Sequence, residues 1–528
     1  MTTKGSSTIR LLKLTEIDEL DELEQIWLGD YRELEEILQH TNDNDQAIQT
    51  ELHEKCQQVQ GHTHMVQALL CGMICDRTRS QQFLRYLHLI VKDGYAVCVK
   101  QLEKLARDKF PKMNDRNAAQ PSQQQMQLLW VVREFVNLKV QGIDKVCIAL
   151  LRQIQGGNVR SATNRWLNTN LCMLFQESKT WLYEQTQLIP MVFYTFCRLA
   201  ADHADPKYDK LRRMEGQLCC DLFRDKFSEC KVIGREAVRL LQQVCKIPEF
   251  EGLWEDILNN PQQFGGMTDI SDLFSVRTPK DFLQSRLTPQ MEEQLLFIME
   301  RVTMGQQQRY QRWFMQKWGL MEPGGDALIP DLVRYICGFH HPSNEVLRSN
   351  LVQRWAVVGW LLKCAKTPTS VANIKLAMFY DWLFYSPRND SVMNIEPAAL
   401  LITRSIPKWL DITVDLMEFM FALADLWSKP SVDRCREGIF HAAADCVQKG
   451  VIKSWAQVST CPQINPVLRA RVRAQFRGFC PGDPEEIAVE DVKVMGRCAL
   501  SSSLIGPSGV WIQKLVKSWG GTDTITSK

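Results

Sequence analysis

The stretch DLVRYICGFHHPSNEVLRSNLVQRWAVVGWLL, residues 331–362, shows how this chain is built. Apolar side chains recur at helical spacing on both sides of a polar break that contains His-His-Pro at 340–342. Pro342 cannot continue the first helix, and the Ser-Asn pair at 343–344 offers a good N-cap for the next one. Adjacent histidines point in different directions, and no second thiol lies in register with Cys337. We therefore interpret the break as a corner between two helices, rather than as a metal or catalytic site.

The same helical spacing continues outward from this corner, from Thr15 to about Arg477. In TRSQQFLRYLHLIVKDG (78–94), for example, apolar residues fall at i, i+1, i+4, i+7 and i+8, which makes one stripe along a helix. Strict alternation of apolar and polar residues, the sign of a strand, is nearly absent. Helix-stopping glycines and prolines recur every ~15–25 residues. The sequence predicts an all-α fold, an α-solenoid of stacked antiparallel helix pairs of the HEAT/ARM-like kind.

Four parts are expected along the chain. A flexible N-terminus (1–14) precedes an N-terminal helical-repeat lobe (15–258). The loop NNPQQFGGMTDIS (259–271) separates this lobe from a central helical-repeat lobe (272–479). The remaining segment (480–528) is acidic at its start and punctuated by proline and glycine, so we expect an irregular, weakly ordered C-terminal tail.

The totals exclude several classes of protein. Hydrophobic residues make up 45% of the 528 residues and charged residues 23%, which is typical of a folded soluble chain. The 63 basic and 61 acidic residues leave a net charge of +2, so a globally basic surface for nucleic acid is absent, although a local patch is compatible with this balance. Most of the 18 cysteines lie in apolar runs, which favours a reducing compartment, cytosol or nucleus. We expect no membrane span and no secretory signal.

Motifs for chemistry are missing from the sequence. It contains no nucleophile elbow, phosphate-binding loop, zinc-protease helix or kinase signature. His62 and His64, with Cys71 and Cys75, are the next-best metal candidate, but buried thiols with capping histidines are the preferred explanation. We therefore expect no enzyme, no metal and no cofactor; an unrecognised hydrolase is the weakest alternative.

Two segments fit binding better. The helix expected at 373–390 is apolar nearly all round, so it is either a central helix packed on both faces or one with a face open to a partner. In the second case Asp381, Trp382, Tyr385 and Arg388 would form an anchor cluster for a partner protein.

The other segment is NPVLRARVRAQFRGF (465–479). Arg469, Arg473 and Arg477 cluster beside an apolar face. A solvated basic flank is the plain interpretation, and contact with an acidic partner or with phosphates is the alternative.

Several longer stretches resemble the N-terminal half of the Integrator complex subunit 3 family, whose members also take part in the SOSS complex. The resemblance covers about residues 50–479, and the stretches that carry it are CKVIGREAVRLLQQVCKIPEFEGLWEDILNNP (230–261), RLTPQMEEQLLFI (286–298), GQQQRYQRWF (305–314), DLVRYICGFHHPSNEVL (331–347), RWAVVGWLL (354–362) and KLAMFYDWLFYSPRNDSVMNIEPA (375–398).

The resemblance implies a non-catalytic α-solenoid scaffold in the nucleus and cytoplasm. Family members hold an OB-fold single-stranded-DNA-binding protein and a small third SOSS subunit, and this trimer acts in DNA double-strand-break repair. They also belong to Integrator, which processes small nuclear RNA 3′ ends and controls transcription. Nucleic acid would then be bound indirectly, through the partner's groove. The family continues into a second helical half, which carries docking to other Integrator subunits. The alternative is a helical-repeat protein that binds nucleic acid directly through arginine-rich faces.

Overall fold

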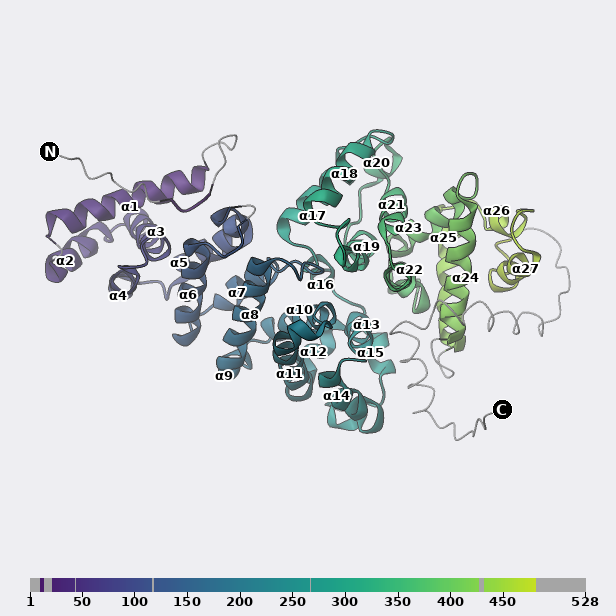
Figure 1. Ribbon diagram of the computed structural model, residues 1–528, viewed down its shortest axis with the longest axis horizontal. Helices are drawn as coiled ribbons and strands as arrows, with labels where there is room; N and C mark the ends of the chain where they lie inside the picture. The colour runs from purple at the N-terminus through teal and green to yellow at the C-terminus, as the bar shows by residue number, and fades with distance from the viewer. Residues whose placement is uncertain are drawn as a thin grey trace. The chain divides into compact units, whose positions relative to one another are not determined.

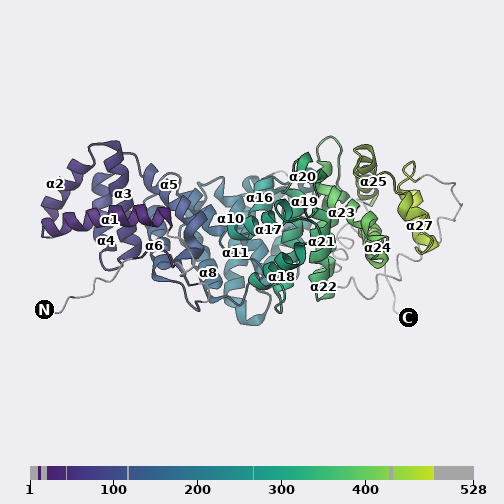
Figure 2. The same cartoon turned by 90° about the horizontal axis from the view of Figure 1, so that it is seen from above.

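The computed structural model describes residues 10–13, 21–42, 44–115, 118–265, 267–426 and 432–480. Of the expected flexible N-terminus (1–14), residues 10–13 are described, and Leu11 and Leu12 are buried. The expected C-terminal tail (480–528) lies outside the described residues except for Cys480. Within them the secondary structure is helical, and the extended residues Thr303 and Leu351 form an isolated bridge rather than a sheet. The predicted all-α fold is confirmed. Successive helices pack against one another as in an α-solenoid (Figures 1 and 2).

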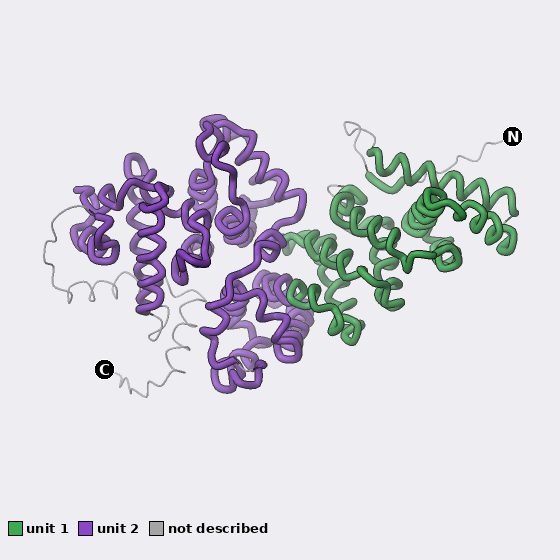
Figure 3. Tube along the Cα trace, turned by 180° about the vertical axis from the view of Figure 1, so that it is seen from behind, with its two compact units in different colours: residues 1–155, 159–192 green, residues 156–158, 193–528 purple. Residues whose placement is uncertain are grey.

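The chain divides into two compact units: residues 1–155 with 159–192 form unit 1, and residues 156–158 with 193–528 form unit 2 (Figure 3). The lobe boundaries expected from the sequence stay a prediction. Short non-α turns are η1 (Leu105–Lys109, π-helical) and the 3₁₀ turns η2 (Phe110–Met113), η3 (Pro206–Tyr208), η4 (Lys231–Ile233), η5 (Pro261–Gln263) and η6 (Gly325–Leu328).

Unit 1 is organised around α3, which packs against α1, α4, α5 and α6. The apolar run of α3 from Ala68 to Ile74 is entirely buried, as the thiol-rich sequence predicts. The helices of unit 1 are α1 (Glu22–His40), α2 (Asp45–Lys55), α3 (Val59–Cys75), α4 (Ser80–Ile90), α5 (Ala96–Lys104), α6 (Gln123–Asn137), α7 (Ile143–Leu151), α8 (Ala162–Glu177), α9 (Lys179–Leu182) and the start of α10 (Leu188–Asp202).

Unit 2 is organised around α22, which packs against α19, α23, α24 and α25. Every residue of α22 from Ile374 to Leu383 is buried. After the end of α10, the helices of unit 2 are α11 (Asp209–Asp225), α12 (Phe227–Cys230), α13 (Arg235–Gln243), α14 (Pro248–Asn259), α15 (Ser271–Ser275), α16 (Lys280–Gln284), α17 (Pro289–Glu300), α18 (Gln307–Lys317), α19 (Ile329–Gly338), α20 (Asn344–Arg348), α21 (Arg354–Cys364), α22 (Pro368–Leu383), α23 (Val392–Ser405), α24 (Leu410–Leu426), α25 (Val432–Gln448), α26 (Ala456–Ser459) and α27 (Pro466–Gln475).

The corner predicted at the His-His-Pro sequence is confirmed. Helix α19 ends at Gly338, and Ser343 caps α20 by accepting a hydrogen bond from the backbone N–H of Val346 at 3.4 Å. His340 is buried within the corner, and no group of three or more potential metal ligands forms among the described residues. None of the described helices combines the length and apolar character that a membrane crossing requires.

Candidate functional site

The start of α13 places charged side chains inside unit 2. Gly234 precedes the helix with a φ of +63°, and a Cβ there would come within 2.2 Å of the carbonyl oxygen of Val276. Glycine is therefore required for the close approach of the two backbones. Two hydrogen bonds fix that approach: the N–H of Arg235 donates to the Val276 carbonyl at 3.0 Å, and the N–H of Glu236 donates to Thr278 Oγ1 at 3.1 Å. The Glu236 side chain is consequently held in the interior.

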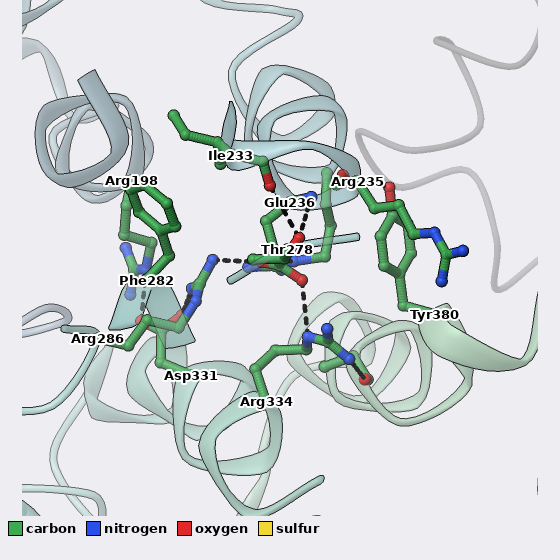
Figure 4. Close-up of polar contacts among 12 residues, drawn as sticks. Arg198, Ile233, Arg235, Glu236, Thr278, Phe282, Arg286, Asp331, Arg334 and Tyr380 are labelled. Carbon is green, nitrogen blue, oxygen red and sulfur yellow. Dashed lines mark hydrogen bonds and ion pairs between the residues drawn. The ribbon is translucent and has the colours of Figure 1, made fainter. Parts of the chain in front are cut away.

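Glu236 is the centre of a buried network of charges (Figure 4). Its Oε2 accepts hydrogen bonds from Arg239 Nε at 3.0 Å and Arg286 Nη2 at 2.8 Å, and its Oε1 accepts one from Arg334 Nε at 2.8 Å. The side chains of Glu236, Arg239 and Arg286 are completely buried. One carboxylate therefore joins α13, the α16–α17 connection and α19.

Asp331, on α19, extends the network toward α10. One of its oxygens pairs with Arg286, and Oδ2 accepts a hydrogen bond from Arg198 Nε at 2.6 Å. Arg198 also pairs with Asp202 one turn along its own helix, at 2.7 Å. The end of α10 is thereby fixed to α19 by charge.

Arg334 carries the network to α22. Its Nη1 donates to Asp381 Oδ2 at 3.1 Å and to the Ala377 carbonyl at 3.1 Å. Asn394, at the start of α23, donates its amide hydrogen to the same carboxylate oxygen at 3.3 Å. Asp381, which interrupts an apolar helix in the sequence, is thus the acid that neutralises a buried arginine.

The network holds four arginines and four carboxylates, so its charges balance; the members are Arg198, Arg239, Arg286 and Arg334 with Asp202, Glu236, Asp331 and Asp381. Burial alone would raise the pKa of Glu236, but the charges of Arg239, Arg334 and Arg286 outweigh it and hold that pKa well below its usual range. The pKa of Asp331 is lowered in the same way, because the nearby arginines outweigh its burial. Both acids therefore stay ionised at neutral pH.

These properties suit a structural clamp rather than a catalytic centre. A guanidinium does not release its proton near neutral pH, and a carboxylate with a lowered pKa is a poor proton acceptor. Glu236 and Arg239 are also inaccessible to solvent, so a substrate cannot reach them. Such a network specifies one arrangement of helices, because a change of register would leave buried charges unpaired.

The structure places three of the four residues of the expected anchor cluster inside the fold. Asp381 belongs to the buried network. Trp382 is fully buried, and the centre of its ring lies 6.2 Å from the centre of the Trp455 ring. The hydroxyl of Tyr385 donates to Asp445 Oδ2 at 2.5 Å. Burial of these three side chains argues against an exposed anchor cluster and fits the preferred interpretation, a central helix packed on both faces. Only Arg388 of the set is exposed, and partner binding at this helix stays a prediction.

The three arginines of the C-terminal segment are less alike than their spacing suggests. Arg469 and Arg473 are half-buried on α27, and Arg473 Nη1 donates to the Ser459 carbonyl at 3.1 Å. Arg477 is exposed and lies beyond the end of the helix at Gln475. Contact with phosphates or with an acidic partner stays a prediction for all three.

Sequence reasoning missed the network centred on Glu236. A signal was present in GREAVRLLQQ (234–243), where the charged residues share a short helix with apolar ones and eight of the nine helical residues are buried. Periodicity alone does not reveal which distant arginine meets which carboxylate.

Comparison with known proteins gives the family. The family model described as Integrator complex subunit 3 N-terminal matches residues 60–474, which is most of the chain. The chain belongs to this family. The proteins named Integrator complex subunit 3 from Pongo abelii and Homo sapiens are each 39% identical to it over 440 residues. A homolog from Dictyostelium discoideum is 40% identical over 427 residues. The expected family resemblance is confirmed.

The family match begins at the start of α3, after α1 and α2, and includes the whole Glu236-centred network. The alignments to the Pongo abelii and Homo sapiens members cover 83% of this chain and 41% of each relative. For the Dictyostelium discoideum member the shares are 79% and 27%. The chain thus spans about two fifths, or less, of the length of these family members.

Proposed function

We propose that the chain is a non-catalytic scaffold that binds an OB-fold single-stranded-DNA-binding protein together with a small third subunit, in a SOSS-like complex that responds to DNA double-strand breaks. We further propose that it serves in the Integrator complex, in small nuclear RNA 3′-end processing and transcription control, and that it works in the nucleus and the cytoplasm. Membership of the Integrator complex subunit 3 family is the observation that carries this proposal.

The architecture supports a binding role. A scaffold binds most economically when its surface is already ordered, because little conformational entropy is then lost on association. The ion pairs of the Glu236-centred network fix α10, α13, α19 and α22 to one another through the chain's own side chains. The outer faces of the helices packed around that network are consequently presented in a fixed arrangement.

The direct test is assembly from purified parts. The chain is mixed with the OB-fold protein and the third, small protein, and the mixture is run on a sizing column with light scattering. We expect the three to elute together, earlier than any of them alone. Separate elution at concentrations well above those in cells would end the proposal.

Arg388 gives this test a residue-level form. It is the solvent-exposed member of the predicted anchor cluster, and Arg388→Glu reverses its charge without disturbing the interior. Arg404→Glu, also exposed and on α23, is the matched control. If Arg388 contacts the partner, the dissociation constant of the Arg388→Glu complex should be at least about tenfold higher than that of the control. Equal dissociation constants would show that Arg388 lies outside the interface.

A further inference from the structure

One exposed surface of unit 2 combines aromatic rings with cations. Helix α18 has the sequence QQRYQRWFMQK and contains no acidic residue. Arg309 and Arg312 are exposed, and so is the indole of Trp313, at 40% of its maximum. Tryptophan and arginine side chains are enriched at binding surfaces relative to the rest of a protein surface.

Contacts with α21 continue this surface. Phe314, on the inner face of α18, is fully buried with its ring 6.2 Å from that of Trp360. Met315 Sδ lies 3.2 Å from Cys364 Sγ on the same helix α21. Helix α18 is therefore fixed beside α21, as Figures 1 and 2 also show. Its cationic face is not a mobile loop.

A second cation–aromatic pair lies at the far end of α21, beside the turn between α23 and α24. Lys363, at the end of α21, places its Nζ 4.1 Å from the ring centre of Trp409, which is 44% exposed. Lys408, next to that tryptophan, is exposed as well. We call the exposed set Arg309, Arg312, Trp313, Lys363, Lys408 and Trp409 the basic–aromatic surface.

Four cations of this surface have no acidic partner in the part of the chain that the structure describes. Among the described residues, no carboxylate forms an ion pair with Arg309, Arg312, Lys363 or Lys408, and the neighbouring exposed Asp411 pairs with none of them. Other exposed cations vary: Lys55 pairs with Glu33 at 2.5 Å, whereas Arg388 and Arg404 form no ion pair with a described carboxylate. The basic–aromatic surface is thus a local excess of positive charge on a nearly neutral chain.

We propose that the basic–aromatic surface binds single-stranded nucleic acid directly. Unpaired arginines and lysines attract phosphates, and exposed indole faces stack with unpaired bases of any sequence. A duplex hides the faces of its bases, so the exposed tryptophans favour a single strand over a double helix. An acidic protein would use the cations but not the flat aromatic faces between them. This contact is additional to any strand that a partner protein holds.

The first experiment measures how much the positive side chains contribute to binding. The chain is purified alone, so that no OB-fold partner can bind the probe, and fluorescence anisotropy is recorded with labelled oligothymidylate, oligouridylate and a DNA duplex at several salt concentrations. We expect both single strands to bind more tightly than the duplex. The variant Arg309→Ala/Arg312→Ala/Lys363→Ala should bind at least about tenfold more weakly, and its slope of log K against log salt should be shallower by about two.

A matched control separates local from global charge. Arg85→Ala/Lys100→Ala/Lys145→Ala removes the same charge from three exposed positions of unit 1. The proposal expects this control to bind like the unaltered chain. An equal loss of affinity in the control, or absence of binding by the unaltered chain at low salt, would overturn the proposal and leave the surface to an acidic protein.

The second experiment measures how much stacking on the two tryptophan rings contributes to binding. Trp313→Ala/Trp409→Ala removes two exposed rings and no charge, so the salt slope should be unchanged while affinity falls by about tenfold or more. Circular dichroism verifies that this variant is folded. Unchanged affinity would contradict the stacking part of the proposal. Comparison of the two oligonucleotides shows whether DNA or RNA is the better ligand.

Discussion

The interior of unit 1 is built mainly from apolar side chains, whereas the interior of unit 2 is crossed by buried arginines and carboxylates. In unit 1 the buried acid Glu24 needs no cation, because the backbone N–H groups of Leu11 and Leu12 donate to its Oε1 at 3.0 and 2.9 Å. In unit 2 the buried acid Glu236 meets three arginines from separate segments. The two units therefore reach the same kind of helix packing by different means.

The difference between the two interiors affects how uniquely the helices are positioned more than it affects the free energy of unfolding. Apolar surfaces tolerate small shifts and substitutions of similar volume. A buried ion pair adds little net stability over an apolar core, but removal of one partner is costly because the other charge stays buried and unpaired. Unit 2 should thus depend sharply on single charged residues, and unit 1 should not.

The largest effect is expected from Glu236→Gln. This change leaves Arg239, Arg286 and Arg334 without their shared negative charge, and it should lower the free energy of unfolding by about 3–5 kcal/mol. Hydrogen exchange with mass spectrometry should show faster exchange in α13, α19 and α22 and little change in unit 1. The control Glu255→Gln, at an exposed position on α14, should behave like the unaltered chain. Similar hydrogen exchange in the Glu236→Gln and Glu255→Gln variants would show that the network does not hold these helices together.

The corresponding change in unit 1 is Leu69→Ala. Leu69 is fully buried in α3, and its truncation should cost about 2–5 kcal/mol by loss of apolar contact and creation of a cavity. Hydrogen exchange should now rise in α1, α3 and α4 and stay unchanged in α13 and α19. Increased exchange throughout unit 2 would show that the units do not have separate interiors.

Acid should distinguish the units further. Burial, with help from nearby positive charge, lowers the pKa of both His340 and His341 from 6.5 to about 4. The unfolded chain therefore takes up these protons first, so stability contributed by the neutral histidines is lost as pH falls from about 6.5 to 4. In unit 1, burial raises the pKa of Asp30 despite His64, so acidification stabilises the folded state at that residue. Protection of unit 2 amides against exchange should fall by about tenfold or more over this range.

The assay for this prediction is hydrogen exchange at a series of pH values, corrected for the intrinsic exchange rate. The variant His340→Asn/His341→Asn should flatten the pH dependence of unit 2. If the pH dependence of exchange in unit 2 persists in this variant, it is caused by titratable groups other than these two histidines.

The smallest effect is expected at the surface of unit 1. Lys55 and Glu33 form an exposed ion pair at 2.5 Å, and exposed pairs contribute less than about 1 kcal/mol. Lys55→Ala should therefore change the unfolding free energy little, as urea titration can measure. A loss as large as that of Glu236→Gln would contradict the distinction between buried and exposed charges.

Much of the fold could be predicted from the sequence because its signals are local. Helical spacing and the break before Ser343 lie within a few residues of the structure they determine. The apolar character of α22 is evident in the sequence, yet its environment is not, since the same pattern suits a central helix and a docking helix.

The buried network could not be predicted because its pairs are distant in sequence. Arg334 and Glu236 are separated by 98 positions, and Arg334 and Asp381 by 47. Which helices meet is a property of the whole packing, and a single sequence does not specify it. A lone acid such as Asp381 inside an apolar helix is the local sign that a buried cation lies opposite.

Native-state hydrogen exchange of the unaltered chain, without any partner, tests the central claim that unit 2 is an ordered platform fixed by buried charge. We expect amides of α13, α19 and α22 to exchange only through global unfolding and to be among the slowest in the chain. Rapid exchange of these helices, slowed only when a binding protein is added, would mean that the platform forms on binding and is not fixed by the buried charges.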